Sequence, residues 1–185
     1  MLIAGIIAVL VLIFGIGIYN SLINKKNQVT NAFSAIDVMV KKRFDLIPNL
    51  VEVVKQYTGH EAGTLEKITE LRGRAISPVA TEGDKLALDQ QIGAAVKGLM
   101  VSVENYPELK ANTNFLNLQS TWTESEEQIA AARRNYNATV TSYNNAVMQF
   151  PGNMFAGMLG YVPMPVLAAS EQERANISAK ELFNS

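Results

Sequence analysis

The chain has 185 residues, a formal net charge of −1 and no cysteine. This composition excludes disulfides, thiol chemistry and thiolate metal sites, and the length fits one domain with short appendages. The charge is uneven, because residues 1–55 hold six Lys or Arg against three Asp or Glu. The sequence shows no basic face with interleaved aromatic residues, so nucleic acid is not expected as a partner.

An uncharged apolar run opens the chain from Leu2 to Tyr19, and the uncharged stretch continues to Asn24. A helix needs about 20 predominantly apolar residues to span a bilayer, so this run is long enough. A basic segment before it and a small-x-small cleavage signature after it would indicate a signal peptide, and the sequence has neither. We therefore predict a single-pass transmembrane anchor over residues 1–24, with membrane lipid as a partner.

The positive charges nearest the anchor predict its orientation. They follow the apolar run, at Lys25, Lys26, Lys41, Lys42 and Arg43. Positive charge is retained on the cytoplasmic side of a membrane, so the N-terminus is expected outside and the rest in the cytoplasm. The alternative is a periplasmic or extracellular position.

The first helix is predicted to continue beyond the anchor to about Tyr57. Its apolar residues recur in steps of three and four, as in a helix packed against other helices: Val29, Phe33, Ile36, Val40, Ile47, Leu50, Val54 and Tyr57. Pro48 lies inside this pattern. Because proline removes a backbone hydrogen bond and clashes with the preceding turn, we expect a kink near residues 44–47.

Three further helices follow by the same criterion. The second carries Leu65, Ile68, Leu71 and Ala75, and the third carries Leu88, Ile92, Ala95, Leu99 and Val103. The fourth has the most regular repeat, at Phe115, Leu118, Trp122, Ser125, Ile129, Ala132, Tyr136, Thr139, Tyr143, Ala146 and Phe150. The segment 77–84 is a loop, and no stretch alternates as a strand. The sequence therefore predicts an all-α protein, in which an N-terminal transmembrane helix precedes an antiparallel four-helix bundle of coiled-coil character over residues 25–150.

Arg43 occupies a position in the first helix where the repeat calls for an apolar residue. A buried arginine needs a partner, since an unpaired buried charge is very costly. The fourth helix has a matching irregularity at Ser125, flanked by Glu124 and Glu126, so we predict a structural polar lock between Arg43 and Glu126. The alternative is that Arg43 extends to water beside Lys41 and Lys42.

Other residues that could take part in catalysis or ligand binding give weaker indications of a functional site. His60 is the single histidine and lies at an expected helix end, where a structural role is favoured. Motifs for metal binding, nucleophilic catalysis or phosphate binding are missing from the sequence, so we predict no catalytic, cofactor-binding or metal-binding residues. Tyr136-Asn137 and Tyr143-Asn144 are seven positions apart and share a helix face. Packing is their expected role, and a binding site is the alternative.

The tail over residues 151–185 is apolar and contains proline and glycine. Its segment MFAGMLGYVPMPVLAA carries no charge, yet it is too short and too interrupted to span a bilayer. An apolar stretch of this size must be covered. We predict an oligomer contact or, second, a membrane contact, and expect the tail to add little to the bundle core. The candidate contact residues are Phe155, Leu159, Tyr161, Val162, Val166 and Leu167.

Three ordered blocks resemble the LemA family of bacterial membrane proteins: IDVMVKKRFDLIPNLVEVVKQYTGHE, ENYPELKANTNFLNLQ and SEEQIAAARRNYNATVTSYNNAV. The resemblance covers nearly the whole chain through FPGNMFAGMLGY. It implies an N-terminal anchor in the bacterial inner membrane, followed by an antiparallel helical bundle. Where the family has Thr-Glu this chain has Ser125-Glu126, and where it has Gly-Phe this chain has Gly160-Tyr161; both changes are mild.

Three functional hypotheses remain from the sequence. The first is a homo-oligomeric membrane scaffold that organises or remodels the bilayer. The second is an adaptor for another membrane protein, such as an envelope-stress protease or a signalling system. The third is an enzyme, which requires carboxylates from several helices to meet in a cleft. We favour the first, without catalysis and without a cofactor.

Overall fold

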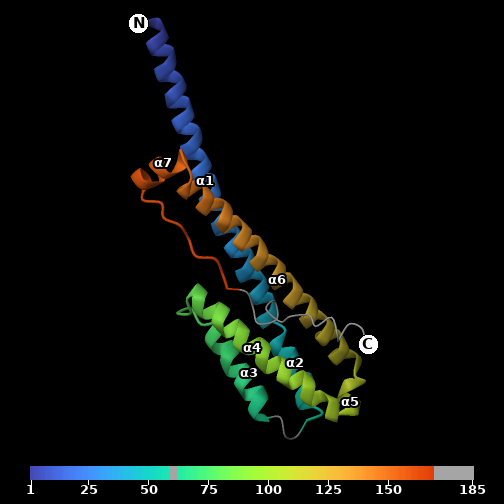
Figure 1. Ribbon diagram of the computed structural model, residues 1–185. Helices are drawn as coiled ribbons and strands as arrows, with labels where there is room; N and C mark the ends of the chain where they lie inside the picture. The colour runs from blue at the N-terminus through green and yellow to red at the C-terminus, as the bar shows by residue number, and fades with distance from the viewer. Residues whose placement is uncertain (59–61, 169–185) are drawn as a thin grey trace, which may run out of the picture. The chain divides into compact units, whose positions relative to one another are not determined.

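The computed structural model describes residues 1–58 and 62–168, and these residues form helices with no strand (Figure 1). The prediction of an all-α fold is therefore confirmed. The helices are α1 (Leu2–Phe44), α2 (Ile47–Lys55), α3 (Ala62–Ala75), α4 (Glu82–Ser102), the short 3-10 helix η1 (Val103–Asn105), α5 (Pro107–Lys110), α6 (Thr113–Met148) and α7 (Gly152–Leu159). His60, discussed above, lies outside the described residues.

The chain divides into two compact units. Met1–Val29 together with Asn135–Ser185 form one, here the terminal unit, and Thr30–Arg134 form the other, here the bundle unit. The long helices α1 and α6 each contribute to both units. The predicted division into an anchor, a bundle of residues 25–150 and a tail stays a prediction, and each unit is described below by itself.

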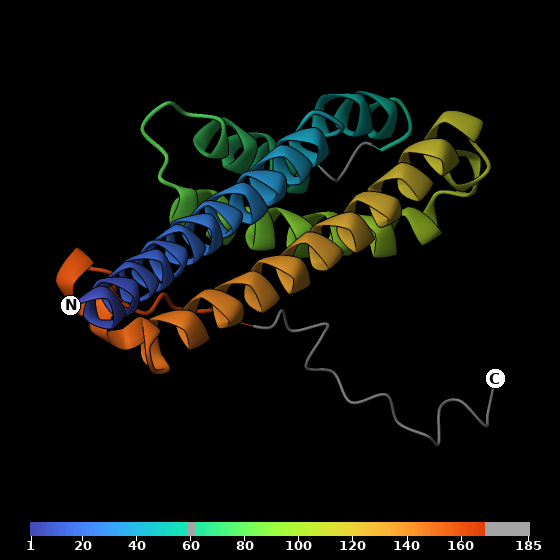
Figure 2. The ribbon, with the colours of Figure 1, turned by 90° about the horizontal axis from the view of Figure 1, so that it is seen from above.

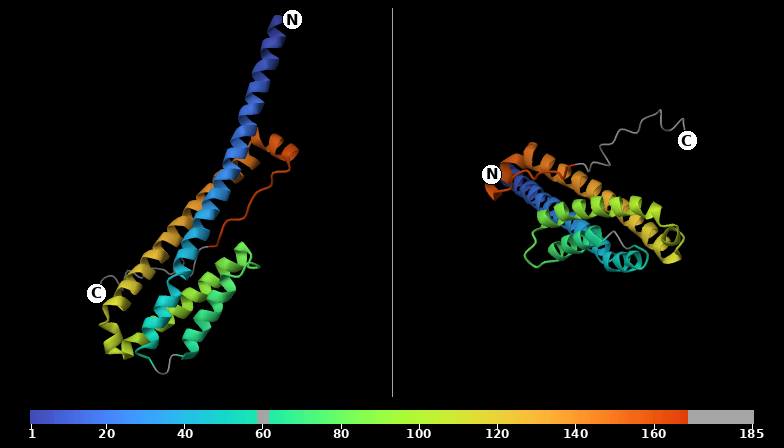
Figure 3. Two further views of the ribbon diagram at one scale, coloured as in Figure 1. Left: turned by 180° about the vertical axis from the view of Figure 1, so that it is seen from behind. Right: turned by 90° about the horizontal axis from the view of Figure 1, so that it is seen from below.

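The bundle unit consists of four antiparallel helical segments. The second half of α1 continued by α2, then α3, α4 and the first half of α6 run alternately up and down, and α3 and α4 lie side by side as a hairpin (Figures 1 and 3). Their facing apolar side chains are almost completely buried, at Ile36, Val40, Ile47, Leu50, Val54, Leu65, Ile68, Leu71, Ile92, Val96, Leu99, Phe115 and Ile129. This core follows the spacing of three and four residues in the sequence.

The break expected at Pro48 is present between α1 and α2. α1 ends at Phe44 and α2 begins at Ile47, with Pro48 in its first turn, where its missing N–H is not needed. The end of α1 is supported from α3, since Arg72 Nε donates a hydrogen bond of 2.8 Å to the Phe44 carbonyl. A cation at the carboxyl end of a helix satisfies a carbonyl that has no partner within the helix.

Polar side chains cap the first turns of α4 and α6. Thr81 Oγ1 accepts the Asp84 N–H at 3.2 Å, while Asp84 Oδ2 accepts the Thr81 N–H at 3.0 Å, which makes a capping box for α4. The hydrogen bonds from Thr81 lower the pKa of Asp84. Asn112 Oδ1 accepts the Phe115 N–H at 3.0 Å and caps α6 in the same way.

The terminal unit packs the end of α6 and the helix α7 against the first half of α1 (Figure 2). Its core consists of the buried residues Leu22, Val29, Val140, Tyr143, Val147 and Ala156, with Ile18, Tyr136, Ala146, Phe155, Tyr161 and Met164 partly buried around them. Since Ala156 belongs to this core, the expectation that the tail adds little to the packing is wrong.

The buried face of α6 departs from the predicted repeat after Ile129. The predicted positions Ala132, Thr139 and Ala146 are only partly buried, and Phe150 is 79% exposed. Buried residues instead lie one position later, at Arg133, Val140 and Val147. Two successive four-residue steps, from Ser125 through Ile129 to Arg133, produce this shift, which is the effect of a stutter in a three-four repeat.

Within residues 1–58 and 62–168, one helical stretch is long and apolar enough to cross a membrane. It lies near the N-terminus, and its most apolar window has a mean hydropathy of 2.8 with none of that window buried. Every side chain from Met1 to Phe14 is exposed. Because its side chains are exposed on all sides, the segment 1–14 differs from a helix buried in a protein core.

Candidate functional site

A guanidinium group lies inside the bundle unit at the end of α1. Arg43 is 5% exposed, and its Nη2 donates both to the Asp89 carboxylate and, at 3.1 Å, to the Asp89 carbonyl. Its Nη1 lies 3.6 Å from Glu126 Oε1. Arg43 therefore connects α1 with α4 and α6 through charged groups, and the alternative of an arginine extended to water is wrong.

Asp89 is the principal partner of Arg43 and is itself almost fully buried. Burial raises the pKa of the Asp89 carboxyl above its ordinary value, because removal of water disfavours the charged form. The attraction of Arg43 and its hydrogen bond lower that pKa but do not cancel the effect of burial. The pair is therefore held in a strongly desolvated environment.

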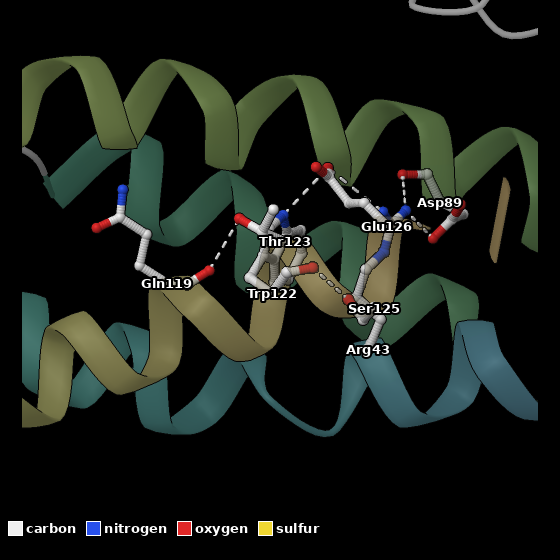
Figure 4. A network of polar contacts seen from close by, with 7 residues as sticks. All are labelled: Arg43, Asp89, Gln119, Trp122, Thr123, Ser125 and Glu126. Atoms are coloured by element: carbon white, nitrogen blue, oxygen red, sulfur yellow. Dashed lines mark hydrogen bonds and ion pairs between the residues drawn. The ribbon is translucent and has the colours of Figure 1, made fainter. Parts of the chain in front are cut away.

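Glu126 and Trp122 complete the contacts of Arg43 from α6 (Figure 4). Trp122 Nε1 donates to Glu126 Oε1 at 3.2 Å, and the guanidinium carbon lies 5.1 Å from the centre of the Trp122 ring. A desolvated cation over a tryptophan ring is attracted to its electron-rich face. Ser125 Oγ donates to the Trp122 carbonyl at 2.6 Å, so the hydroxyl at this core position bonds within its own helix.

Gly93 of α4 lies against this group of charges, the charge layer, which we define as Arg43, Asp89, Glu126 and Arg133. A Cβ placed on Gly93 would lie 3.8 Å from Arg43 Nη2 and 3.9 Å from Glu126 Oε1. Arg133 is buried, and its charge lowers the pKa of Asp89. Two cations and two anions thus balance each other, which suits a structural role in aligning the helices.

The described surface of the bundle unit offers two shallow grooves away from the charge layer. One is lined by Leu116, Gln119, Ser120, Thr123, Glu124 and Glu127, and the other by Asn49, Glu52, Val53, Asn114, Asn117, Leu118 and Thr121. Neither is lined by Arg43 or Asp89. Within residues 1–58 and 62–168, no three His, Cys, Asp or Glu side chains come together as metal ligands.

In the terminal unit, two asparagines of α6 bind the main chain of the tail. Asn144 Nδ2 donates to the Met164 carbonyl at 2.8 Å, and its Oδ1 accepts the Met164 N–H at 2.8 Å. Asn137 binds Leu167 in the same two-bond manner, at 3.0 and 2.8 Å. Each amide thus satisfies one residue's donor and acceptor together.

We call these two asparagine–main-chain pairs the clamps. The distance between the two asparagines along α6 is similar to the distance between the two tail residues that they bind. Asn137 and Asn144 are seven residues apart, about 10.5 Å along an α-helix. Met164 and Leu167 are three residues apart, about 9 Å in a polyproline II conformation. Partial burial at Tyr161, Met164 and Leu167, with the residues between them exposed, shows the same period of three. We call residues 161–168 the strap.

The predicted contact residues of the tail divide into two groups. Phe155, Tyr161 and Leu167 lie partly buried against their own chain, whereas Leu159, Val162 and Val166 are exposed. Tyr143 Oη also donates to the Val162 carbonyl at 3.1 Å, and Lys26 Nζ lies 4.8 Å from the centre of the Tyr161 ring. The Tyr-Asn pairs therefore bind the strap as well as packing.

In the part of the chain that the structure describes, the fold is that of a helical protein whose N-terminal helix is apolar and long enough to cross a membrane. The chain belongs to the LemA family, whose model matches residues 32–180. Protein LemA of Metamycoplasma hominis is 30% identical over 169 residues, which cover 91% of this chain and 77% of that protein.

Two magnetosome proteins are more distantly similar. MamQ 2 of Paramagnetospirillum magneticum is 25% identical and MamQ of Magnetospirillum gryphiswaldense 24%, each over 168 residues. Each match covers 77% of this chain and 62% of the relative. The chain therefore spans less than two thirds of the length of these relatives.

The substitution Arg43→Ala is expected to destabilise the bundle unit by about 3–5 kcal/mol, because it leaves a buried carboxylate without its partner. In double-mutant cycles measured by denaturant unfolding, Arg43 should couple more strongly to Asp89→Asn than to Glu126→Gln. Glu126 is more exposed and lies farther away.

Lys41→Ala provides the matched control. Lys41 pairs with Asp45 at 3.0 Å, but both side chains are well exposed, so the expected loss is below about 1 kcal/mol. Equal, small effects of Arg43→Ala and Lys41→Ala would contradict the structural role of the charge layer.

The strap is expected to detach when its clamps are removed. Asn144→Ala and Asn137→Ala each remove two hydrogen bonds, each worth about 0.5–1.5 kcal/mol, so hydrogen exchange at the Met164 and Leu167 amides should accelerate. The neighbouring, exposed Asn145→Ala serves as the control and should leave both rates unchanged. Identical exchange in all three variants would show that the clamps do not hold the strap.

Proposed function

We propose that this protein is a single-pass, membrane-anchored helical scaffold, without catalytic activity, that assembles into a homo-oligomer at the bacterial cell membrane. In this proposal the assembly organises or remodels the bilayer. Membrane lipid and further copies of the chain are its partners, and no cofactor takes part.

The main support for a homo-oligomer is the strap, which presents exposed apolar side chains on an ordered main chain. Its main chain is fixed to α6 by Asn137 and Asn144, while Val162 is 68% and Val166 54% exposed. A surface whose backbone is already ordered loses little conformational freedom on binding. Exposed apolar side chains on such a surface favour contact with another protein surface.

The charge layer supports the same proposal. A scaffold must hold its shape, and buried, paired charges restrict the ways in which helices can slide past one another. The charged groups at Arg43 and Asp89 are engaged with each other and withdrawn from solvent. Their geometry favours alignment of helices over chemistry on a substrate.

The second candidate is an adaptor for another membrane protein, such as an envelope-stress protease or a signalling system. The same exposed strap residues favour it, because an apolar surface can receive a different protein as readily as a second copy. The two candidates differ in the composition of the complex extracted from the membrane.

The mass of the complex in lipid-containing polymer discs tests the proposal. We expect a homogeneous homomer for the native chain and a smaller species for Val162→Asp with Val166→Asp, at unchanged helical content. Val101→Asp is the matched control, since Val101 is also exposed but lies on α4, and its complex should keep the native mass. A stoichiometric second protein would favour the adaptor, and a monomer would contradict assembly.

The proposed orientation has its own test, which the absence of cysteine makes simple. In intact cells, Val79→Cys in the exposed loop before α4 should resist a membrane-impermeant thiol reagent, because the bundle unit is expected in the cytoplasm. A cysteine in a short extension before Met1 should react. The reverse labelling pattern would place the bundle unit outside the cytoplasm.

A further inference from the structure

The helix α7 carries large apolar side chains that its own unit does not cover. Met154 and Met158 are 63% and 85% exposed, and Met148 and Phe150, which precede the helix, are also exposed. The sequence contains no charged residue between Arg134 and Glu171, so α7 lies in the middle of an uncharged stretch. Such a surface is unfavourable in water.

The contacts of α7 place it beside the apolar part of α1. The Phe155 ring lies 3.5 Å from the position of a Cβ on Gly15, and Ala156 packs in the same core as Leu22. If the bilayer core takes about 20 residues starting at Leu2, it ends near Ser21. Gly15 is six residues before that point, so Phe155 meets α1 about 9 Å inside the apolar region.

Two lysines of the terminal unit, Lys25 and Lys26, follow the Phe155 contact along α1, on the side away from the N-terminus. Lys25 Nζ donates to Ser142 Oγ at 2.7 Å, and Lys26 lies over the Tyr161 ring, after the end of α7. Lysine side chains mark the level of the lipid headgroups next to a membrane helix. Along α1, Gly15 lies ten residues before Lys25, so the Phe155 contact is nearer the hydrocarbon than the charges are.

The main chain of α7 is suited to a medium with little water. At its end Gly160, with φ of 68°, forms a Schellman motif, in which the Tyr161 N–H donates to the Ala156 carbonyl at 3.0 Å and the Gly160 N–H to the Gly157 carbonyl at 3.4 Å. Satisfied backbone groups are required where lipid replaces water. At its start, a Cβ on Gly152 would overlap the Ala146 carbonyl, which fixes a close turn from α6.

We propose that α7 is an in-plane membrane helix, inserted at the boundary between headgroups and acyl chains beside the exit of α1. Its eight residues are too short to span a bilayer, and it crosses α1 rather than running along it (Figures 1 and 3). A depth of about 5–10 Å is typical of such interfacial helices and agrees with the Gly15 contact. The exposed residues Met154, Met158 and Phe150 then contact lipid.

This inference rests on the anchor in the proposed function, but not on oligomer formation. The occupant is the bilayer and not a second copy, because α7 is attached to a segment of α1 whose remaining faces are exposed apolar side chains. Whatever surrounds that segment also surrounds α7. For a membrane anchor, the surrounding medium is lipid.

Site-directed spin labelling of the full chain tests the position of α7. Single cysteines replace Met158, Phe150, Ile13 in the anchor, and Val101 on α4, and each labelled protein is reconstituted in vesicles of phosphatidylcholine and phosphatidylglycerol. Oxygen concentrates in lipid and a nickel chelate in water. We expect the labels at Met158 and Phe150 to respond more to oxygen, as at Ile13 but at a shallower depth, and the label at Val101 to respond more to nickel.

Each other outcome has a distinct meaning. A Met158 label that nickel reaches as it reaches Val101 overturns the inference and leaves the anchor standing. A Met158 label that neither reagent reaches also overturns it, in favour of a protein contact. A water-exposed label at Ile13 overturns the membrane anchor and with it both proposals. A monomeric protein whose Met158 label is exposed to lipid contradicts only the proposed homo-oligomer.

Discussion

The desolvated pair of Arg43 and Asp89 is the interaction on which the bundle unit depends. A buried guanidinium cannot lose its charge, so it must meet its partners at one level of the bundle. Sliding of α4 or α6 by one turn, about 5.4 Å, would separate the charges and leave them unpaired in the core. Apolar side chains alone tolerate such shifts, since one aliphatic contact can replace another.

Much of this fold can be predicted from the sequence because its helices are long and periodic. The break at Pro48 and the core of α2 and α3 agree with the structure, since each follows from local backbone chemistry or from the spacing of apolar residues. The predicted loop 77–84 is present but shorter, because the capping box of Thr81 and Asp84 starts α4 at Glu82. The unusual position of Arg43 is also evident in the sequence. Its need for a partner follows from electrostatics.

The identity of that partner is less evident in the sequence. Glu126 is suggested by its irregular neighbour Ser125, yet Asp89 makes the closer contacts. A signal for Asp89 does exist, because Asp89, Ile92, Val96 and Leu99 are spaced by three, four and three residues. The sequence alone favours an exposed position for Asp89, because the neighbouring Leu88 can begin the apolar repeat of this helix in its place.

The binding of the strap could not be predicted, because it depends on hydrogen bonds between α6 side chains and a main chain 20 to 30 positions later. Such bonds leave no periodic mark in the sequence. The shift of the buried face after Ile129 is not evident in the sequence for a related reason. Alanines and threonines at the predicted positions fit a half-buried surface as well as a core.

The two asparagines hold the strap by atoms that every residue type except proline possesses. The side chains of Val162 and Val166 therefore take no part in the hydrogen bonds that attach the strap to α6, and both are exposed. A family built on this arrangement could change the outward face of the strap freely while keeping the same attachment. Divergence in partner choice would then require no change in the fold.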